Sequence, residues 1–217
     1  MTSAEPNLRL FVAIELPSEW LEALEQAQGE LRAGLDKRGL RRLRWVRAGG
    51  IHLTLKFLGG VPESRVSSVR WALKEATQAP FAFGLAMGRL GAFGDRRGPR
   101  VVWAGVDGVE VADRQRLYAL VEHIETWFAS AGFPREGRFS PHLTLARVPE
   151  DFSRDERAAV ADVSAGVSLR RTEPMAVTAL ALMRSHLGPG GAHYERLAAF
   201  PERADDKTAR SDPASAD

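Results

Sequence analysis

The chain has 217 residues, no cysteine, 44% apolar residues and a formal net charge of +2. This composition allows a sizeable core in one domain or one two-lobed unit, and the lack of cysteine excludes disulfides and thiolate metal ligands. No stretch approaches the roughly 20 apolar residues of a membrane helix, and the first eight residues carry no signal-peptide core. We therefore expect a cytoplasmic protein without membrane contact.

Apolar periodicity predicts strands that alternate with helices along the chain. The predicted strands are 9–16, 43–46, 51–58, 81–93, 100–106, 141–147, 176–183 and 194–200, and the predicted helices are 18–35, 62–76, 111–131 and 154–163. Because some strands follow one another as hairpins between the helices, the pattern favours an α+β fold over a doubly wound parallel sheet. After Pro201 the chain becomes polar and small, so we predict one domain over residues 1–200 and a disordered tail over residues 201–217.

The most informative feature is a repeated tetrapeptide. The string His-Leu-Thr-Leu occurs at residues 52–55 and again at residues 142–145, each time within a predicted strand. Strand alternation places the histidine and the threonine on one face and the two leucines on the other, where they can be buried. The repeat indicates two similar lobes, each with an antiparallel sheet, related by a pseudo-twofold axis around a central cleft.

Two imidazoles and two hydroxyls in one cleft suit the hydrolysis of a cyclic phosphate. One of His52 and His142 can accept a proton from water while the other donates a proton to the departing ribose oxygen, since both protonation states of histidine occur near neutral pH. The hydroxyls of Thr54 and Thr144 can donate hydrogen bonds to nonbridging phosphate oxygens. This chemistry requires no metal and no cofactor.

Further side chains are candidates for binding a nucleic acid. By strand alternation Lys56 shares the face of His52 and could supply positive charge, or it could simply end the strand. Six basic residues gather between positions 37 and 47, where they could meet phosphates or form a solvated loop. Several aromatic residues could stack bases or pack in the core, namely Trp45, Phe57, Phe93 and Phe139.

The motifs resemble the two-histidine phosphoesterases, and more closely the bacterial and archaeal RNA 2′,3′-cyclic phosphodiesterases, also called 2′-5′ RNA ligases. The matching segments are 9–14, 52–59, 140–147 and 185–197. The resemblance implies a bilobal α+β fold that hydrolyses RNA 2′,3′-cyclic phosphate ends to 2′-phosphomonoesters, with a weak reverse reaction joining tRNA halves. It also implies that His52 is the proton donor, His142 the proton acceptor and Arg147 a phosphate contact. The residues alone leave the acid–base order open, and alternation places Arg147 opposite His142 unless the strand twists or ends there.

The residues leave three other functional hypotheses to consider. The same fold could act on 2′-5′ oligonucleotides or small cyclic nucleotides. The chain could instead be an RNA-end-binding module without turnover, although binding alone does not require two titratable groups. A metallohydrolase is disfavoured, because neither histidine has an Asp or Glu at ligand spacing beside it. We expect a monomer whose partner is RNA.

Overall fold

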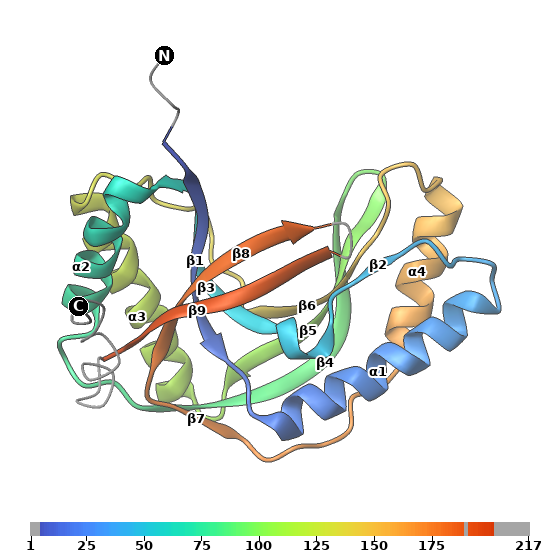
Figure 1. The fold of residues 1–217 in the computed structure, drawn as a ribbon. Helices are drawn as coiled ribbons and strands as arrows, with labels where there is room; N and C mark the ends of the chain where they lie inside the picture. Colours follow the sequence, from blue (N-terminus) through green and yellow to red (C-terminus); the bar gives the residue numbers. More distant parts are fainter. Residues whose placement is uncertain (1–4, 189–190, 202–217) are drawn as a thin grey trace, which may run out of the picture.

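The computed structural model describes residues 5–188 and 191–201 and has the predicted α+β architecture (Figure 1). The strands are β1 (Asn7–Glu15), β2 (Arg44–Trp45), β3 (His52–Pro62), β4 (Phe83–Asp95), β5 (Gly98–Gly108), β6 (His142–Arg147), β7 (Met175–Val177), β8 (Leu180–Gly188) and β9 (Gly191–Phe200). The helices are α1 (Ser18–Asp36), α2 (Val66–Ala76), α3 (Val111–Ser130) and α4 (Arg154–Gly166), with 3₁₀ turns at Ala48–Gly50 and Glu63–Arg65.

Within the described residues, the strands form one antiparallel sheet in the order β7-β4-β5-β6-β3-β1-β8-β9, and β2 pairs with β6. The two motif strands β6 and β3 lie side by side at its centre, with three further strands outside each of them. The expected lobes are thus the two halves of a single sheet, and the β3–β6 seam is the boundary between them.

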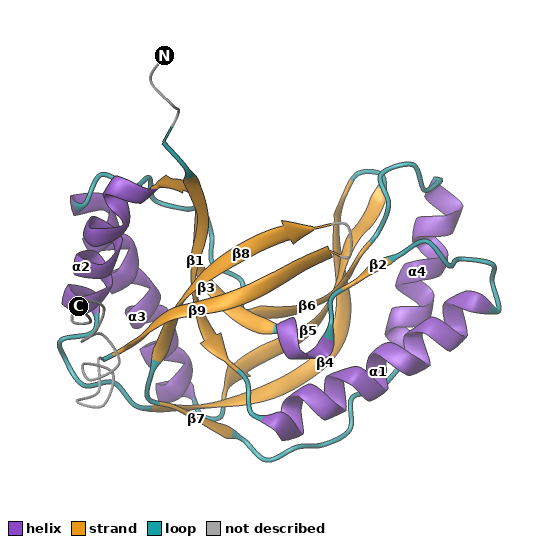
Figure 2. Cartoon of the chain, in the orientation of Figure 1, coloured by secondary structure: helices purple, strands orange, loops and turns teal. Residues whose placement is uncertain are grey.

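Helices cover the sheet in two pairs. Figure 2 shows the strands as a curled layer, with α2 and α3 at one end and α1 and α4 at the other. Strand β1 illustrates why the sheet buries both faces: Leu10, Val12 and Ile14 join the main core, whereas Phe11 and Ala13 pack in a second small cluster with β8. Residues 10–14 of this strand are buried on both faces of the sheet.

The predicted elements agree with the structure except at three places. Strand β3 continues past the predicted end at residue 58 to Pro62, and the helix predicted from residue 62 begins at Val66, after a 3₁₀ turn. The predicted loop between β4 and β5 is shorter than expected, since the two strands pair as far as Asp95 and Gly98. The predicted strand 176–183 divides into β7 and β8, which pair with different neighbours. The predicted disordered tail lies, apart from Pro201, outside the described residues. No helix of the described part is long and apolar enough to cross a membrane.

Candidate active site

The four motif side chains meet where the two lobes join. Strands β3 and β6 pair antiparallel at Leu53 and Leu143, both of which are buried. Continuing this register by one residue in each direction sets His52 opposite Thr144 and Thr54 opposite His142. Each histidine therefore has the threonine of the other motif as its cross-strand neighbour. The structure brings both pairs to one face of the seam, as the repeat predicts.

Both imidazoles are held in the same way. The Nδ1 atom of His52 lies 2.8 Å from the carbonyl oxygen of Gly50, and the Nδ1 atom of His142 lies 2.8 Å from that of Ser140. Because a carbonyl can only accept, each Nδ1 carries the hydrogen. Proton exchange is thereby assigned to the two Nε2 atoms, for which no hydrogen bond is found within the described part of the chain. Each ring is oriented to move a proton at one defined atom.

The two histidines differ in their surroundings. His52 stacks on Phe11 at 4.6 Å between ring centroids and meets the edge of Tyr194 at 4.9 Å, whereas His142 meets the edge of Phe93 at 4.9 Å. Burial lowers the pKa of His52, and this effect is opposed by the Gly50 carbonyl and by the charge of Glu15. The free protein therefore favours a neutral His52, and a bound phosphate anion would favour its protonated form.

A β-bulge in each motif strand decides which later side chains reach the cleft. In the pairing of β3 with β1, Val12 pairs with Lys56 and the next residue, Ala13, pairs with Thr54. Leu55 is therefore an extra residue in β3. In β6, Leu145 is the extra residue in the pairing with β5. A bulge shifts the alternation by one residue. The cleft face consequently contains the residues five positions after each histidine, Phe57 and Arg147.

The prediction that Lys56 faces the cleft is wrong, because the bulge turns its side chain toward the helices. Lys56 is 1% exposed, and its Nζ donates to both carboxylate oxygens of Glu125 on α3 and to the carbonyl of Pro134, each at 2.9 Å. Glu125 also accepts from the backbone N–H of Glu136 at 3.1 Å. This network fastens the segment leading to the second motif onto α3 and β3.

Arg147, in contrast, lies on the cleft face, although simple alternation placed it on the opposite face. It is exposed on the face of His142 and Thr144, opposite Arg44 of β2. The bulge therefore removes the geometric objection to an anion contact by Arg147.

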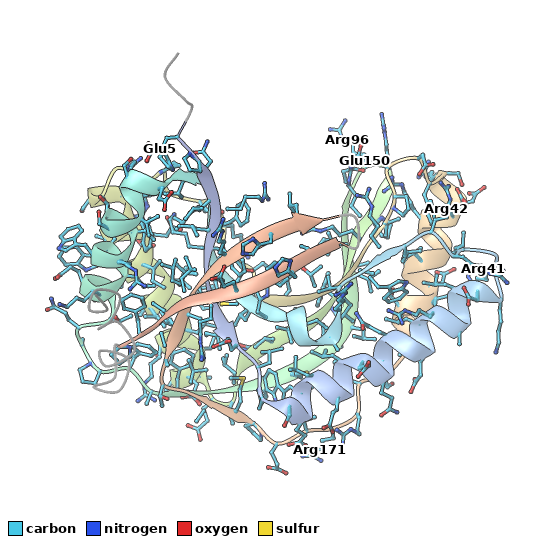
Figure 3. The ribbon with its side chains drawn as sticks, viewed as in Figure 1. Glu5, Arg41, Arg42, Arg96, Glu150 and Arg171 are labelled. Carbon is cyan, nitrogen blue, oxygen red and sulfur yellow. The ribbon has the colours of Figure 1, made fainter. Side chains whose placement is uncertain are left out.

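Much of the basic cluster between residues 37 and 47 points away from the seam. Figure 3 shows Arg41 and Arg42 at the end of the molecule where α1 and α4 lie. Arg42 bonds Asp151 at 2.7 Å and lies over the ring of Phe152, and Arg38 lies 3.7 Å from Asp162. These arginines are occupied with local carboxylates and contribute little to the cleft.

A cavity of about 760 Å³ adjoins one end of the paired motifs. Thr54 and His142 open onto it, and its other walls come from α3 and from the segment before β6. Within residues 5–188 and 191–201, no group of three or more His, Asp or Glu side chains is placed to hold a metal ion. The chemistry of the described site is that of imidazoles, hydroxyls and one arginine.

A two-lobed sheet with a His-x-Thr pair on each central strand defines a two-histidine phosphoesterase. The model of the family "LigT like Phosphoesterase" matches residues 14–103 and 109–194. The chain therefore belongs to the LigT-like phosphoesterase family.

Known relatives and solved structures agree with this assignment. An RNA 2′,3′-cyclic phosphodiesterase of Archaeoglobus fulgidus is 30% identical over 89% of this chain and 99% of its own length. A protein of the same name from Geobacillus stearothermophilus is 29% identical over 88% of this chain, which spans 56% of that relative. E. coli LigT complexed with 3′-AMP superposes with a TM-score of 0.63 at 26% identity, covering 89% of this chain and 97% of LigT.

Proposed function

We propose that this protein hydrolyses the 2′,3′-cyclic phosphate at RNA ends to a 2′-phosphomonoester. The observation that carries the proposal is the pair of imidazoles on adjoining strands, each with Nδ1 bound to the carbonyl two residues earlier. The relatives named RNA 2′,3′-cyclic phosphodiesterase support the same substrate class. The solved complex of E. coli LigT with 3′-AMP also agrees with a nucleotide ligand.

The chemistry follows from the two Nε2 atoms. In hydrolysis, His142 takes a proton from water as the water oxygen bonds to phosphorus, and His52 gives a proton to O3′ as the P–O3′ bond breaks. Thr54 and Thr144 donate to the nonbridging oxygens, and Arg147 adds a positive charge on the same face. The order of donor and acceptor follows the family resemblance, and a bound phosphate anion would raise the lowered pKa of His52 toward the protonated form that a donor needs.

The same groups can open the cyclic phosphate with an alcohol in place of water. A 5′-hydroxyl would lose its proton to His142 as its oxygen bonds to phosphorus, and O3′ would receive a proton from His52 as the P–O3′ bond breaks, which leaves a 2′-5′ phosphodiester. Joining of tRNA halves would be this step, the reverse of the cleavage of a 2′-5′ bond, and it needs no energy source beyond the cyclic phosphate. We further propose that the enzyme is a cytoplasmic monomer whose catalytic unit is residues 1–200.

The deciding experiment uses an RNA oligomer ending in a 2′,3′-cyclic phosphate, with chelator present and phosphorus NMR as readout. The expected wild-type product is a 2′-phosphate, with rates reduced by about 10²-fold or more in His52→Ala and in His142→Ala. A folded wild-type protein that binds this RNA without turning it over would refute the hydrolase proposal in favour of an RNA-end-binding module. Turnover only of 2′-5′ oligonucleotides or of small cyclic nucleotides would move the activity to those substrates.

A further inference from the structure

The cavity next to Thr54 and His142 has a structural origin in the seam. Strands β3 and β6 are paired at one position only, Leu53 with Leu143, and the space beyond Thr54 is left to the segment that precedes β6. Residues 135–140 of this segment form one wall of the cavity, and α3 forms another. A space of about 760 Å³ is within the size range of small-ligand sites in proteins.

Aromatic side chains line this cavity on both sides. Phe57 reaches it from β3 and Tyr118 from α3, and each is 43% exposed. The ring of Tyr118 meets the edge of Phe139 with centroids 5.6 Å apart, so the two rings form a supported platform. Aromatic faces that remain open to solvent beside a phosphate-processing site are suited to stacking nucleobases.

The three carboxylates that line the cavity are each hydrogen-bonded, whereas one arginine has no ion pair among the described residues. Glu125 is paired with Lys56, Glu122 with Arg135, and a carboxylate oxygen of Glu136 accepts from the backbone N–H of Phe57. Arg138 also lines the cavity, and no ion pair is found for it in the described part of the chain. Its guanidinium is therefore available to a phosphodiester group.

Aromatic side chains pack around His52 at the opposite end of the site. Phe11 stacks on His52, and the ring of Tyr194 lies against both His52 and the 3₁₀ turn, where a Cβ on Gly50 would come within 3.1 Å of it. An RNA chain that places its terminal phosphate between the histidines finds open space on the side of His142. This space is the cavity.

We propose that this cavity is a subsite for the nucleotide immediately 5′ of the terminal one, with its base on the Tyr118–Phe139 platform and the connecting phosphodiester at Arg138. The inference rests on the proposed function, and it makes the protein an enzyme for RNA ends rather than for mononucleotides. The terminal nucleoside itself lies outside the cavity, so the subsite should discriminate between substrates by chain length.

The test compares two reaction products as ligands, a tetranucleotide ending in a 2′-phosphate and the corresponding nucleoside 2′-monophosphate, by calorimetric titration. The wild-type protein should bind the tetranucleotide more tightly. Tyr118→Ala and Arg138→Gln should each weaken tetranucleotide binding by about fivefold or more and leave mononucleotide binding unchanged. Tyr118→Phe should retain the wild-type affinities. Trp71→Ala is the matched control, since Trp71 is an equally exposed aromatic residue on α2 that does not line the cavity.

Several results would overturn the subsite. One such result is equal affinity of the wild-type protein for both ligands. Another is wild-type affinity of Tyr118→Ala and Arg138→Gln for the tetranucleotide. An equal loss for both ligands would show that the cavity holds the terminal nucleoside instead. Hydrolysis of the cyclic tetranucleotide is measured separately, so that normal discrimination in binding without any turnover refutes the proposed function and leaves the subsite standing.

Discussion

Replacing Lys56 by methionine isolates the contribution of the buried ion pair beneath the active site. The substitution keeps the length of the side chain but leaves the Glu125 carboxylate, 8% exposed, without the ammonium group that contacts both of its oxygens. Breaking one side of a buried pair costs about 3–5 kcal/mol, because the remaining charge is desolvated and uncompensated. For a chain of this size the loss corresponds to a fall in Tm of roughly 6–20 °C.

Urea unfolding followed by tryptophan fluorescence measures this free energy. The control is Arg135→Gln, which breaks an ion pair between the segment before β6 and the same helix, α3, but on the surface. Exposed pairs contribute about 0–1 kcal/mol, so this control should unfold close to the wild type. A Lys56→Met protein within about 1 kcal/mol of the wild-type stability would refute the reasoning.

The double variant Lys56→Met/Glu125→Leu separates stability from positioning. An apolar pair of similar volume should recover most of the lost stability. It cannot restore the hydrogen bonds to the Pro134 carbonyl and the Glu136 N–H, which hold the segment whose Ser140 carbonyl orients His142. We therefore expect a folded protein with reduced kcat. A double variant as stable and as active as the wild type would show that the network has no positioning role.

Three further predictions concern the cleft. Because burial lowers the pKa of His52, the midpoint of its NMR titration should lie below the usual value near 6.5. If the protonated ring is the proton donor, kcat/KM should fall as the pH rises through that midpoint. A midpoint above 6.5 would contradict the effect of burial on this pKa. Thr54→Val and Thr144→Val should each lower kcat by roughly 10²-fold without unfolding the protein, and unchanged rates would exclude the hydroxyls as phosphate donors. Arg147→Met should reduce kcat/KM by roughly 10–100-fold. The control Arg171→Gln changes an arginine at a distant edge of the molecule (Figure 3) and should leave kcat/KM unchanged. Equal effects of the two substitutions would indicate a non-specific contribution of positive charge.

Periodicity and the repeat were sufficient to predict the elements and to bring His52 and His142 together, because both depend on local patterns. The imidazole contacts could not be predicted, since the carbonyls of Gly50 and Ser140 are positioned by backbone turns rather than by side-chain type. Tyr118 was also missed. A single tyrosine on the solvent side of a helix has no distinguishing pattern, and its position becomes meaningful only once Phe139 is packed against it.

The wrong placement of Lys56 and the apparent conflict at Arg147 have one cause. Strict alternation counts each residue as one step across the sheet, and the extra residues Leu55 and Leu145 break that count at equivalent places. Both leucines are buried and apolar, as residues of a regular strand are, so the residue type gives no sign of a bulge. Had the bulges been recognised, the same pattern argument would have placed Lys56 in the core and Arg147 in the cleft.

The equivalent bulges also explain how a nearly twofold site can bind its substrate in one direction. Each lobe provides a histidine, a threonine and then, after the bulge, a residue on the same face. In the first lobe that residue is the aromatic Phe57, and in the second it is the cationic Arg147. A symmetric cleft would accept a cyclic phosphate in two orientations. An aromatic side chain after Thr54 and a cationic side chain after Thr144 make the two orientations unequal in energy. This inequality is the condition for one histidine to serve as donor and the other as acceptor.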